Sequence, residues 1–300
     1  MGQKLIIDKD TLVEIADAVR EKSGTSESIQ VSELSQAIID IPGGGGATEP
    51  YREDILDSNN PALLVKSKLY GYNKIPTYIF YNQANLTDVV INGATDSIET
   101  HAFDNCVGLV NLTLPNSIKR IESQAFYNCQ NLELTSLPDN LTHIGDTAFF
   151  NCTKLALTSL PSGITVLNSS VFNSCSNLAL TSLPSSIVDI GASVFKGCTN
   201  LALTSLPSNL TAINSNAFYK CTNLAITSIP KVGRLPTRVF ADCLGLTSIV
   251  FQGRPSTIAV DVFVGCTNLT TINVPWAEGA VANAPWGATN ATINYNYTGE

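Results

Sequence analysis

The feature that most constrains this chain is a motif that returns every 23 residues. Its eight cysteines stand at intervals of 23, 23, 23, 23, 23, 22 and 23 residues, each three positions after a phenylalanine and three before a leucine. They are Cys106, Cys129, Cys152, Cys175, Cys198, Cys221, Cys243 and Cys266. Phe80, Gln83 and Leu86 fit the same register, so a first copy has glutamine in the cysteine position. Such self-similarity predicts a solenoid, because each unit buries its apolar face only against its neighbours.

Each unit is expected to contain a short strand after its cysteine. In the outer copies, as in the one that begins at Cys106, apolar side chains follow cysteine at positions +3, +6 and +8. The alternation of +6 and +8 is typical of a strand. In five central copies, as in the one that begins at Cys152, the apolar positions are +3, +5 and +8. Either the threonine at +6 of these copies faces the core or the backbone bulges locally.

The fold class predicted from this pattern is a repeat solenoid of about nine 23-residue units. Its strands would stack as parallel β ladders about 4.8 Å apart, joined by short turns or helical segments. The phenylalanine, leucine, isoleucine and cysteine columns would then form one continuous core, and asparagine or hydroxyl side chains would satisfy the backbone of the turns.

The repeat also explains the cysteines, which could otherwise indicate a disulfide framework. Every cysteine is a core residue of its unit, so we expect buried free thiols. A zinc site is not expected, because the chain has no Cys-x-x-Cys pair and its histidines are only His101 and His143. No copy breaks the pattern as a Cys–His nucleophile pair would require. We therefore expect neither an enzyme nor a cofactor.

Five regions are expected along the chain. Residues 1–42 form two amphipathic helical segments, which are either a minor oligomerising helix pair or a docking module for a larger assembly. Residues 43–50 contain four consecutive glycines and form a flexible hinge. Residues 51–79 cap the first coil, residues 80–272 are the solenoid, and residues 273–300 cap its other end with Trp276 and Trp286.

The low content of charged residues indicates which kinds of partner this chain can bind. Charged residues make up 14% of the chain, against about 25% in ordinary domains. The stretch 123–230 carries seven charged side chains, and the net charge is −8. There is no basic patch for nucleic acid and no apolar run long enough to enter a membrane. The neutral surface, rich in hydroxyl groups, suits contact with glycans or other neutral polymers.

Two columns vary from copy to copy while the core positions stay constant. The first lies two positions before cysteine, between two core residues, and is expected to point outward. The second lies 13 or 14 positions after cysteine and faces solvent. Aromatic side chains in the first would stack on sugars, unless the variation is simple tolerance of exposed positions. The candidate ligand-binding residues are Tyr127, Phe150 and Tyr219 in the first column and Arg120, His143, Asp189 and Arg234 in the second.

The unit from Cys198 to Phe218 resembles the BspA-like leucine-rich repeat, and the resemblance covers about residues 80–275. Its signature is Ile…Ala-Phe-x-x-Cys…Leu. Members of that family are mostly bacterial surface adhesins and protist surface proteins that bind host components. The resemblance therefore implies a leucine-rich repeat solenoid and a binding function.

The two ends resemble a second group of proteins. Leu12-Val-Glu-Ile-Ala-Asp-Ala-Val-Arg-Glu-Lys-Ser-Gly and Val31-Ser-Glu-Leu-Ser-Gln-Ala-Ile are similar to an N-terminal segment of tail and baseplate proteins of phages of Gram-positive hosts. The tail from Val274 to Tyr295 is similar to the end module of the same proteins. The resemblance implies a tail fibre in which residues 1–42 dock on the tail or baseplate. It also implies homotrimers.

We therefore expect a phage receptor-binding protein whose solenoid contacts a glycan or protein of the host cell surface. Met1 to Asp8 do not form a secretory signal, which agrees with a virion protein assembled in the host cytoplasm. Two alternatives remain open: a bacterial surface adhesin of the BspA-like family, and a structural spacer of the virion that has no ligand of its own.

Overall fold

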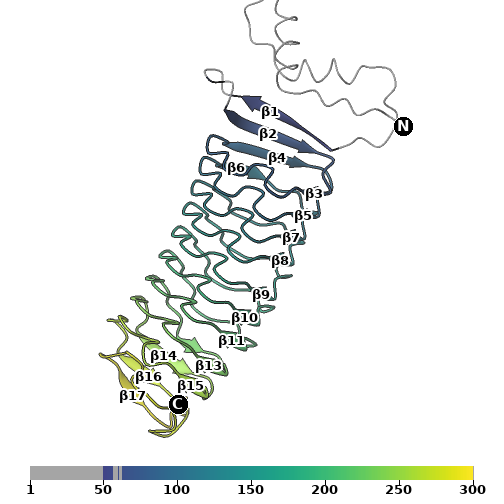
Figure 1. Cartoon of the computed structure of the whole chain (residues 1–300). Helices are drawn as coiled ribbons and strands as arrows, with labels where there is room; N and C mark the ends of the chain where they lie inside the picture. Colours follow the sequence, from purple (N-terminus) through teal and green to yellow (C-terminus); the bar gives the residue numbers. More distant parts are fainter. Residues whose placement is uncertain (1–49, 57–59, 61–62, 300) are drawn as a thin grey trace, which may run out of the picture.

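In the computed structural model, which describes residues 50–56, 60 and 63–299, successive coils stack along one axis (Figure 1). The predicted helical module 1–42 and nearly all of the predicted hinge 43–50 lie outside the described residues. The described coils consist of short strands and turns, without a helix. Accordingly, no described segment is a helix that could cross a membrane.

A first β ladder follows the cysteine position at both ends of the solenoid. At the N-terminal end it contains β1 (Tyr51–Leu56), β2 (Leu64–Tyr70), β4 (Asp88–Asn92) and β6 (Asn111–Thr113). At the C-terminal end it contains β12 (Ser228–Ile229), β14 (Ser248–Phe251), β16 (Thr271–Asn273) and β17 (Thr292–Asn294). Neighbours are parallel except β1 and β2, which are antiparallel. The antiparallel β1 covers the first coil.

A second ladder crosses the opposite part of each coil and is divided into three sheets. The first sheet contains β3 (Lys74–Ile75), β5 (Ser97–Ile98), β7 (Arg120–Ile121) and β8 (His143–Ile144). The second contains β9 (Val166–Leu167), β10 (Asp189–Ile190) and β11 (Ala212–Ile213). The third contains β13 (Arg234–Leu235) and β15 (Thr257–Ile258). The pairs are parallel and in register, and in each strand the second residue is buried.

Four of the five central coils, those that begin at Cys129, Cys152, Cys175 and Cys198, lack the first ladder, and this answers the question left open by the sequence. The fifth, which begins at Cys221, contributes only the two-residue β12. Leu157 is fully buried, whereas Thr158 and Ser159 are both exposed. Within the described part of the chain, the amides of residues 157–160 donate no backbone hydrogen bond. A strand turns alternate side chains to opposite faces, so two consecutive outward residues are incompatible with it. The threonine faces solvent and the backbone leaves the strand path.

The chain turns sharply in the segment that precedes each cysteine. In the copy that ends at Cys129, Gln124 and Asn128 have φ values of 58° and 59°. Asparagine adopts this left-handed conformation more readily than most residues. Its side chain also bridges coils, because Asn128 Nδ2 donates to Asn105 Oδ1 at 2.7 Å. Backbone hydrogen bonds run between coils here as well, such as Phe103 N–H to Ala125 O at 2.8 Å.

Phenylalanine and cysteine build the core column beside these turns. The rings from Phe103 to Phe263 stack coil on coil, with centroids 5.0 to 5.9 Å apart. All eight cysteines are free and buried, which confirms the prediction of buried thiols. Each Sγ–H donates to the carbonyl of the phenylalanine one coil earlier, as Cys129 does to Phe103 at 3.0 Å. Cysteine is therefore a small core residue that also supplies a hydrogen-bond donor.

The C-terminal end is covered by the segment that carries both tryptophans. Trp286 is fully buried and Trp276 is 6% exposed. The two rings meet edge to face at 6.4 Å, and Phe251 contacts both of them. Strand β17 pairs with β16 and so adds one further rung to the first ladder.

Candidate ligand-binding surface

The first residue of each strand in the second ladder changes from one coil to the next, from Lys74 on β3 to Thr257 on β15. It points outward in every strand except β5, where Ser97 is buried. The structure places four candidate residues here: Arg120 and Arg234 are exposed, and His143 and Asp189 are half-buried. Arg120 and His143 are direct neighbours on β7 and β8. Asp189 and Arg234 lie further along the strip, on β10 and β13.

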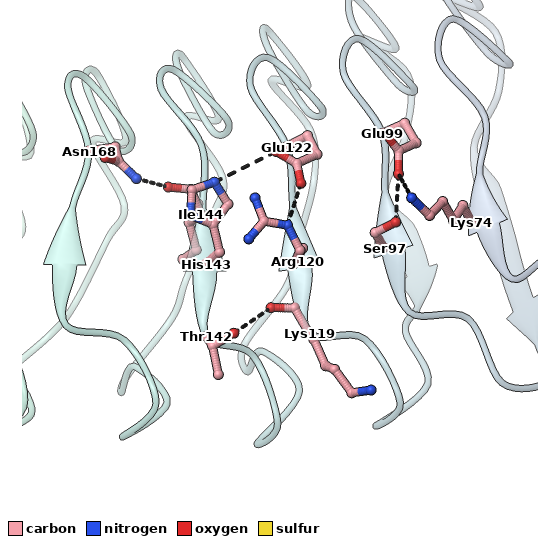
Figure 2. A network of polar contacts seen from close by, with 10 residues as sticks. All are labelled: Lys74, Ser97, Glu99, Lys119, Arg120, Glu122, Thr142, His143, Ile144 and Asn168. Carbon is pink, nitrogen blue, oxygen red and sulfur yellow. Dashed lines mark hydrogen bonds and ion pairs between the residues drawn. The ribbon is translucent and has the colours of Figure 1, made fainter.

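A network of polar and charged side chains links neighbouring strands of the first sheet of this ladder (Figure 2). The Nε atom of Arg120 lies 2.7 Å from Glu122 Oε1. His143 Nε2 lies 3.6 Å from the other oxygen, Glu122 Oε2. One coil earlier, Glu99 Oε1 accepts a hydrogen bond from Ser97 Oγ at 2.6 Å and lies 3.7 Å from Lys74 Nζ. Each carboxylate therefore binds groups on its own coil and on a neighbouring coil, which holds the outward side chains in place.

His143 is uncharged at neutral pH. Burial lowers the pKa of its imidazole below the ordinary value, and the charge of Arg120 lowers it further. The carboxylates of Glu122 and Asp146 raise this pKa and offset part of the effect. A neutral imidazole has one donor and one acceptor nitrogen, so His143 can hydrogen-bond a hydroxyl group without adding charge to the strip.

The second ladder is interrupted between β8 and β9. At this point a side-chain amide, not a backbone amide, donates the hydrogen bond that links the two coils. In neighbouring coils, the backbone amide just after the strand donates a hydrogen bond to the last carbonyl of the strand one coil earlier, as Gly191 N–H does to Leu167 O at 2.8 Å. Here the Asn168 side chain donates to Ile144 O at 2.6 Å instead (Figure 2). The backbone amide of Asn168 makes no such hydrogen bond, and the first sheet therefore ends at β8 while the second begins at β9.

A shallow cleft of about 360 Å³ follows this interruption. Its lining includes Asp146, Val166, Asn168, Asp189 and Asn214. Asn214 Nδ2 donates to Asp189 Oδ1 at 3.0 Å, while Asp146 Oδ1 accepts the amide of residue 169 at 2.8 Å. Val166 is 39% exposed and supplies an apolar surface. Oxygen acceptors, amide groups and the exposed Val166 suit the hydroxyl groups and C–H faces of a sugar.

A second shallow cleft lies at the other interruption, between β11 and β13. It measures about 370 Å³, and its lining includes Ala212, Asn214, Arg234 and Ser256. Asn214 is therefore common to both clefts. The structure thus groups Asp189 and Arg234 with adjoining clefts, whereas Arg120 and His143 lie on the sheet before the first one.

The aromatic candidates lie on a different part of each coil, in the turn before cysteine. Tyr127 and Phe150 are half-buried and stack with centroids 4.9 Å apart at 8°. Tyr219 is half-buried, with Lys196 Nζ 5.8 Å and Lys220 Nζ 5.2 Å from its ring centroid. Among the described residues, no hydrogen bond, ion pair or ring contact joins the aromatic candidates to those of the second ladder.

The expectation that this aromatic column points outward throughout is wrong. Asp104, Asn173 and Ala241 occupy the same column and are 6%, 7% and 0% exposed. Side chains of this column contact the equivalent residues of neighbouring coils, as Tyr127 does Phe150 and Lys196 does Tyr219. A short side chain is therefore covered by longer neighbours, as Ala241 is between a tyrosine and a valine. Elsewhere in the column side chains reach solvent, as Tyr81 and Val264 do at 42% and 43% exposure.

Sequence reasoning missed an exposed aromatic group at the first two coils. Tyr78 stacks on His101 with ring centroids 4.9 Å apart, and Tyr81 meets Tyr78 edge to face at 5.4 Å. The sequence prediction assigns Tyr78 to the N-terminal cap. The register of Phe80 and Gln83 would have revealed that Tyr78 and Tyr81 occupy columns of the repeat.

None of the described residues forms a group of three or more acidic, histidine or cysteine side chains that could hold a metal ion. The thiols are also unsuited to nucleophilic chemistry, because burial raises their pKa values, to about 12 for Cys106 and about 11 for Cys266. A thiol of this kind stays protonated at neutral pH, and the thiolate is the reactive form.

Comparison with known proteins identifies the repeat. A family model described as "BspA type Leucine rich repeat region" matches residues 73–202 and 169–278, with six copies. The chain belongs to the BspA-type leucine-rich repeat family. No curated protein sequence matches it. The family assignment covers the described chain from the second-ladder strand β3 to residue 278.

Two crystal structures share this BspA-type fold. A leucine-rich repeat protein from Bacteroides ovatus aligns with a TM-score of 0.53 at 23% identity, over 74% of this chain and 64% of its own. A leucine-rich cell surface protein from Faecalibacterium prausnitzii aligns with a TM-score of 0.51 at 23% identity, over 84% of this chain and 96% of its own. At these identities the likeness establishes the fold.

Proposed function

We propose that this protein is a non-catalytic attachment protein whose solenoid binds a neutral polymer of a cell envelope. The observation that carries the proposal is the second ladder, where a buried isoleucine or leucine follows a residue that changes from one coil to the next and is exposed or half-buried in every strand except β5. Shallow clefts at its two interruptions contain Asp189 and Arg234. An open cleft that continues along a stack of coils suits a polymer that lies across several units.

The resemblance of the two terminal segments to phage tail and baseplate proteins favours a solenoid that is part of a phage tail. Residues 1–42 resemble segments of tail and baseplate proteins, and would dock there, in trimers, in a virion assembled in the host cytoplasm. The F. prausnitzii protein of the same fold is described as a cell surface protein, which favours a bacterial surface adhesin as the second candidate. A structural spacer of the virion has no ligand and therefore predicts no envelope binding.

Binding of the labelled full chain to envelopes of candidate Gram-positive hosts tests the attachment function. In the cleft variant, Val166→Lys with Asp189→Lys, two long charged side chains block the first cleft. The matched control, Val260→Lys with Asp96→Lys, makes the same changes at exposed positions outside it. We expect strain-selective retention that the cleft variant loses and the control keeps. Equal retention of both variants would exclude this cleft, and no retention of the unaltered chain would favour the spacer.

An antibody against the solenoid distinguishes the two carriers. Labelling of purified phage particles at the tail tip, with no labelling of intact uninfected cells, is the result expected for a tail protein. Labelling of uninfected cells would instead establish the surface adhesin.

A further inference from the structure

The exposed aromatic group at the first two coils has the features of a binding subsite. Tyr78 and Tyr81 are 54% and 42% exposed. They belong to the turn of the first coil, whereas His101 belongs to the turn of the second. The imidazole of His101 lies nearly parallel to the ring of Tyr78, at 10°, and nearly perpendicular to that of Tyr81, at 88°. Two large rings and an imidazole therefore meet at the surface.

A buried carboxylate holds the imidazole in this position. Asp104 Oδ2 lies 2.7 Å from His101 Nδ1, and Asp104 is 6% exposed. Its other oxygen, Oδ1, is buried without a hydrogen-bond partner in the described part of the chain. The carboxylate can only accept, which assigns the proton to Nδ1 and leaves Nε2 as the nitrogen for another partner.

Asp104 is not what folding alone would select at this position. A buried carboxylate oxygen without a partner destabilises the folded state. Other coils hold the neutral Asn173 or Ala241 in the same column, so the fold has no need for a charge. Nor does the local backbone favour a tyrosine at Tyr78, where φ is 60°, because bulky residues rarely adopt this conformation. Both residues are explained if the group contacts a ligand.

We propose that Tyr78, Tyr81 and His101 form a subsite for one pyranose ring of a glycan, with Asp104 as a positioning residue. The inference rests on the proposed function, since it names the sugar contact of the same solenoid. The electron-rich face of an aromatic ring attracts the C–H face of a pyranose. His101 Nε2 accepts a hydrogen bond from a sugar hydroxyl. The stacked Tyr127 and Phe150 continue the same edge over the next two coils, where further sugar units of the chain would lie.

An organic cation fits this group less well. Recognition of a quaternary ammonium needs several open ring faces around one point. Here one face of Tyr78 is covered by the imidazole of His101. The ligand is therefore a neutral ring that carries hydroxyl groups.

Saturation-transfer NMR of the full chain tests the subsite with defined probes. The probes are the methyl glycosides of glucose, galactose, mannose and N-acetylglucosamine, with choline as the cationic comparison. We expect transfer to the ring C–H protons of at least one glycoside and none to choline. Tyr81→Ala and His101→Gln should abolish the signal. The matched control Tyr297→Ala removes a half-buried tyrosine at the opposite end of the solenoid, outside every candidate site, and should leave the signal unchanged.

These variants are chosen to keep the fold. Gln124 occupies the equivalent position in the next coil with φ of 58°, so glutamine is compatible with the backbone of His101. Circular dichroism and thermal unfolding of each variant would test whether the fold is kept.

Three results would overturn the subsite: no transfer to any glycoside, transfer that survives both substitutions, or transfer to choline alone. Envelope retention of the unaltered chain separates this from a failure of the proposed function. Retention without glycoside transfer leaves the attachment function in place and removes only the subsite, whereas absence of retention contradicts the function itself.

Discussion

The terminal and central coils of this solenoid share one core and differ on one face. Ile249 at position +6 of a terminal coil is buried within a paired strand, whereas Thr158 at +6 of a central coil is exposed and outside any strand. Both kinds of coil keep the stacked phenylalanines, the buried cysteines and the turn before cysteine. The first ladder is therefore dispensable for stacking, and the core and the turn hold the coils together.

The contacts that remain in the central coils explain why they stay in register. Phe149 N–H donates to Val171 O at 3.0 Å, and Cys175 Sγ–H donates to Phe149 O at 3.0 Å. On the other side of the cysteine, Ala156 N–H still reaches Leu134 O at 3.0 Å. Each central coil is thus bonded to its neighbours on both sides of the core column.

The largest expected effect comes from removing a core ring in each kind of coil. Phe172 and Phe103 are both fully buried and stacked on two neighbours. Replacing either by alanine should lower the free energy of unfolding by about 3–5 kcal/mol. Urea unfolding followed by circular dichroism measures both. If Phe172→Ala lowered the free energy of unfolding by less than half as much as Phe103→Ala, the core of the central coils would contribute less to stability than the shared packing implies.

Hydrogen exchange gives the sharpest contrast between the two kinds of coil. The amides of residues 157–160 have no backbone acceptor, whereas those of β14 pair with β12 and β16. We expect the central amides to exchange about a hundredfold faster or more, because only a paired amide must open before it exchanges. Native-state exchange read by mass spectrometry or NMR checks this. Equal protection would mean that the central coils form a ladder in solution.

The smallest effect is expected at His143, on the last strand before the first interruption. Its pKa is lowered in the folded protein by burial and by Arg120, so the unfolded chain binds the proton more readily. Stability should therefore fall as the pH drops below about 6.5, the ordinary histidine value. In His143→Gln, the part of the fall in stability at acidic pH that comes from this histidine should disappear. Thermal unfolding between neutral pH and pH 5 compares the two. A steeper acid loss in the variant would show that the contact with Glu122 prevails.

The sequence predicts the shared features of the coils well, because the core columns repeat at a fixed period. It does not decide the backbone path after cysteine in the central coils. The same residues are compatible with a strand whose threonine at +6 faces the core and with a backbone that leaves the strand path. The sequence also misplaces Asp104 and Ala241, whose burial depends on how long the side chains of adjacent coils are. The group around Tyr78 and His101 depends on contacts between coils, which a pattern read along one coil does not contain.

The cysteine column has a consequence for the surroundings that the protein tolerates. Oxidation begins from the thiolate, and burial keeps these eight thiols protonated inside the core. No pair of them is joined, so a reductant has no bond to break. The solenoid should therefore keep one covalent form under reducing and oxidising conditions alike, and a molecule that passes from the interior of a cell to the open medium would need no redox maturation.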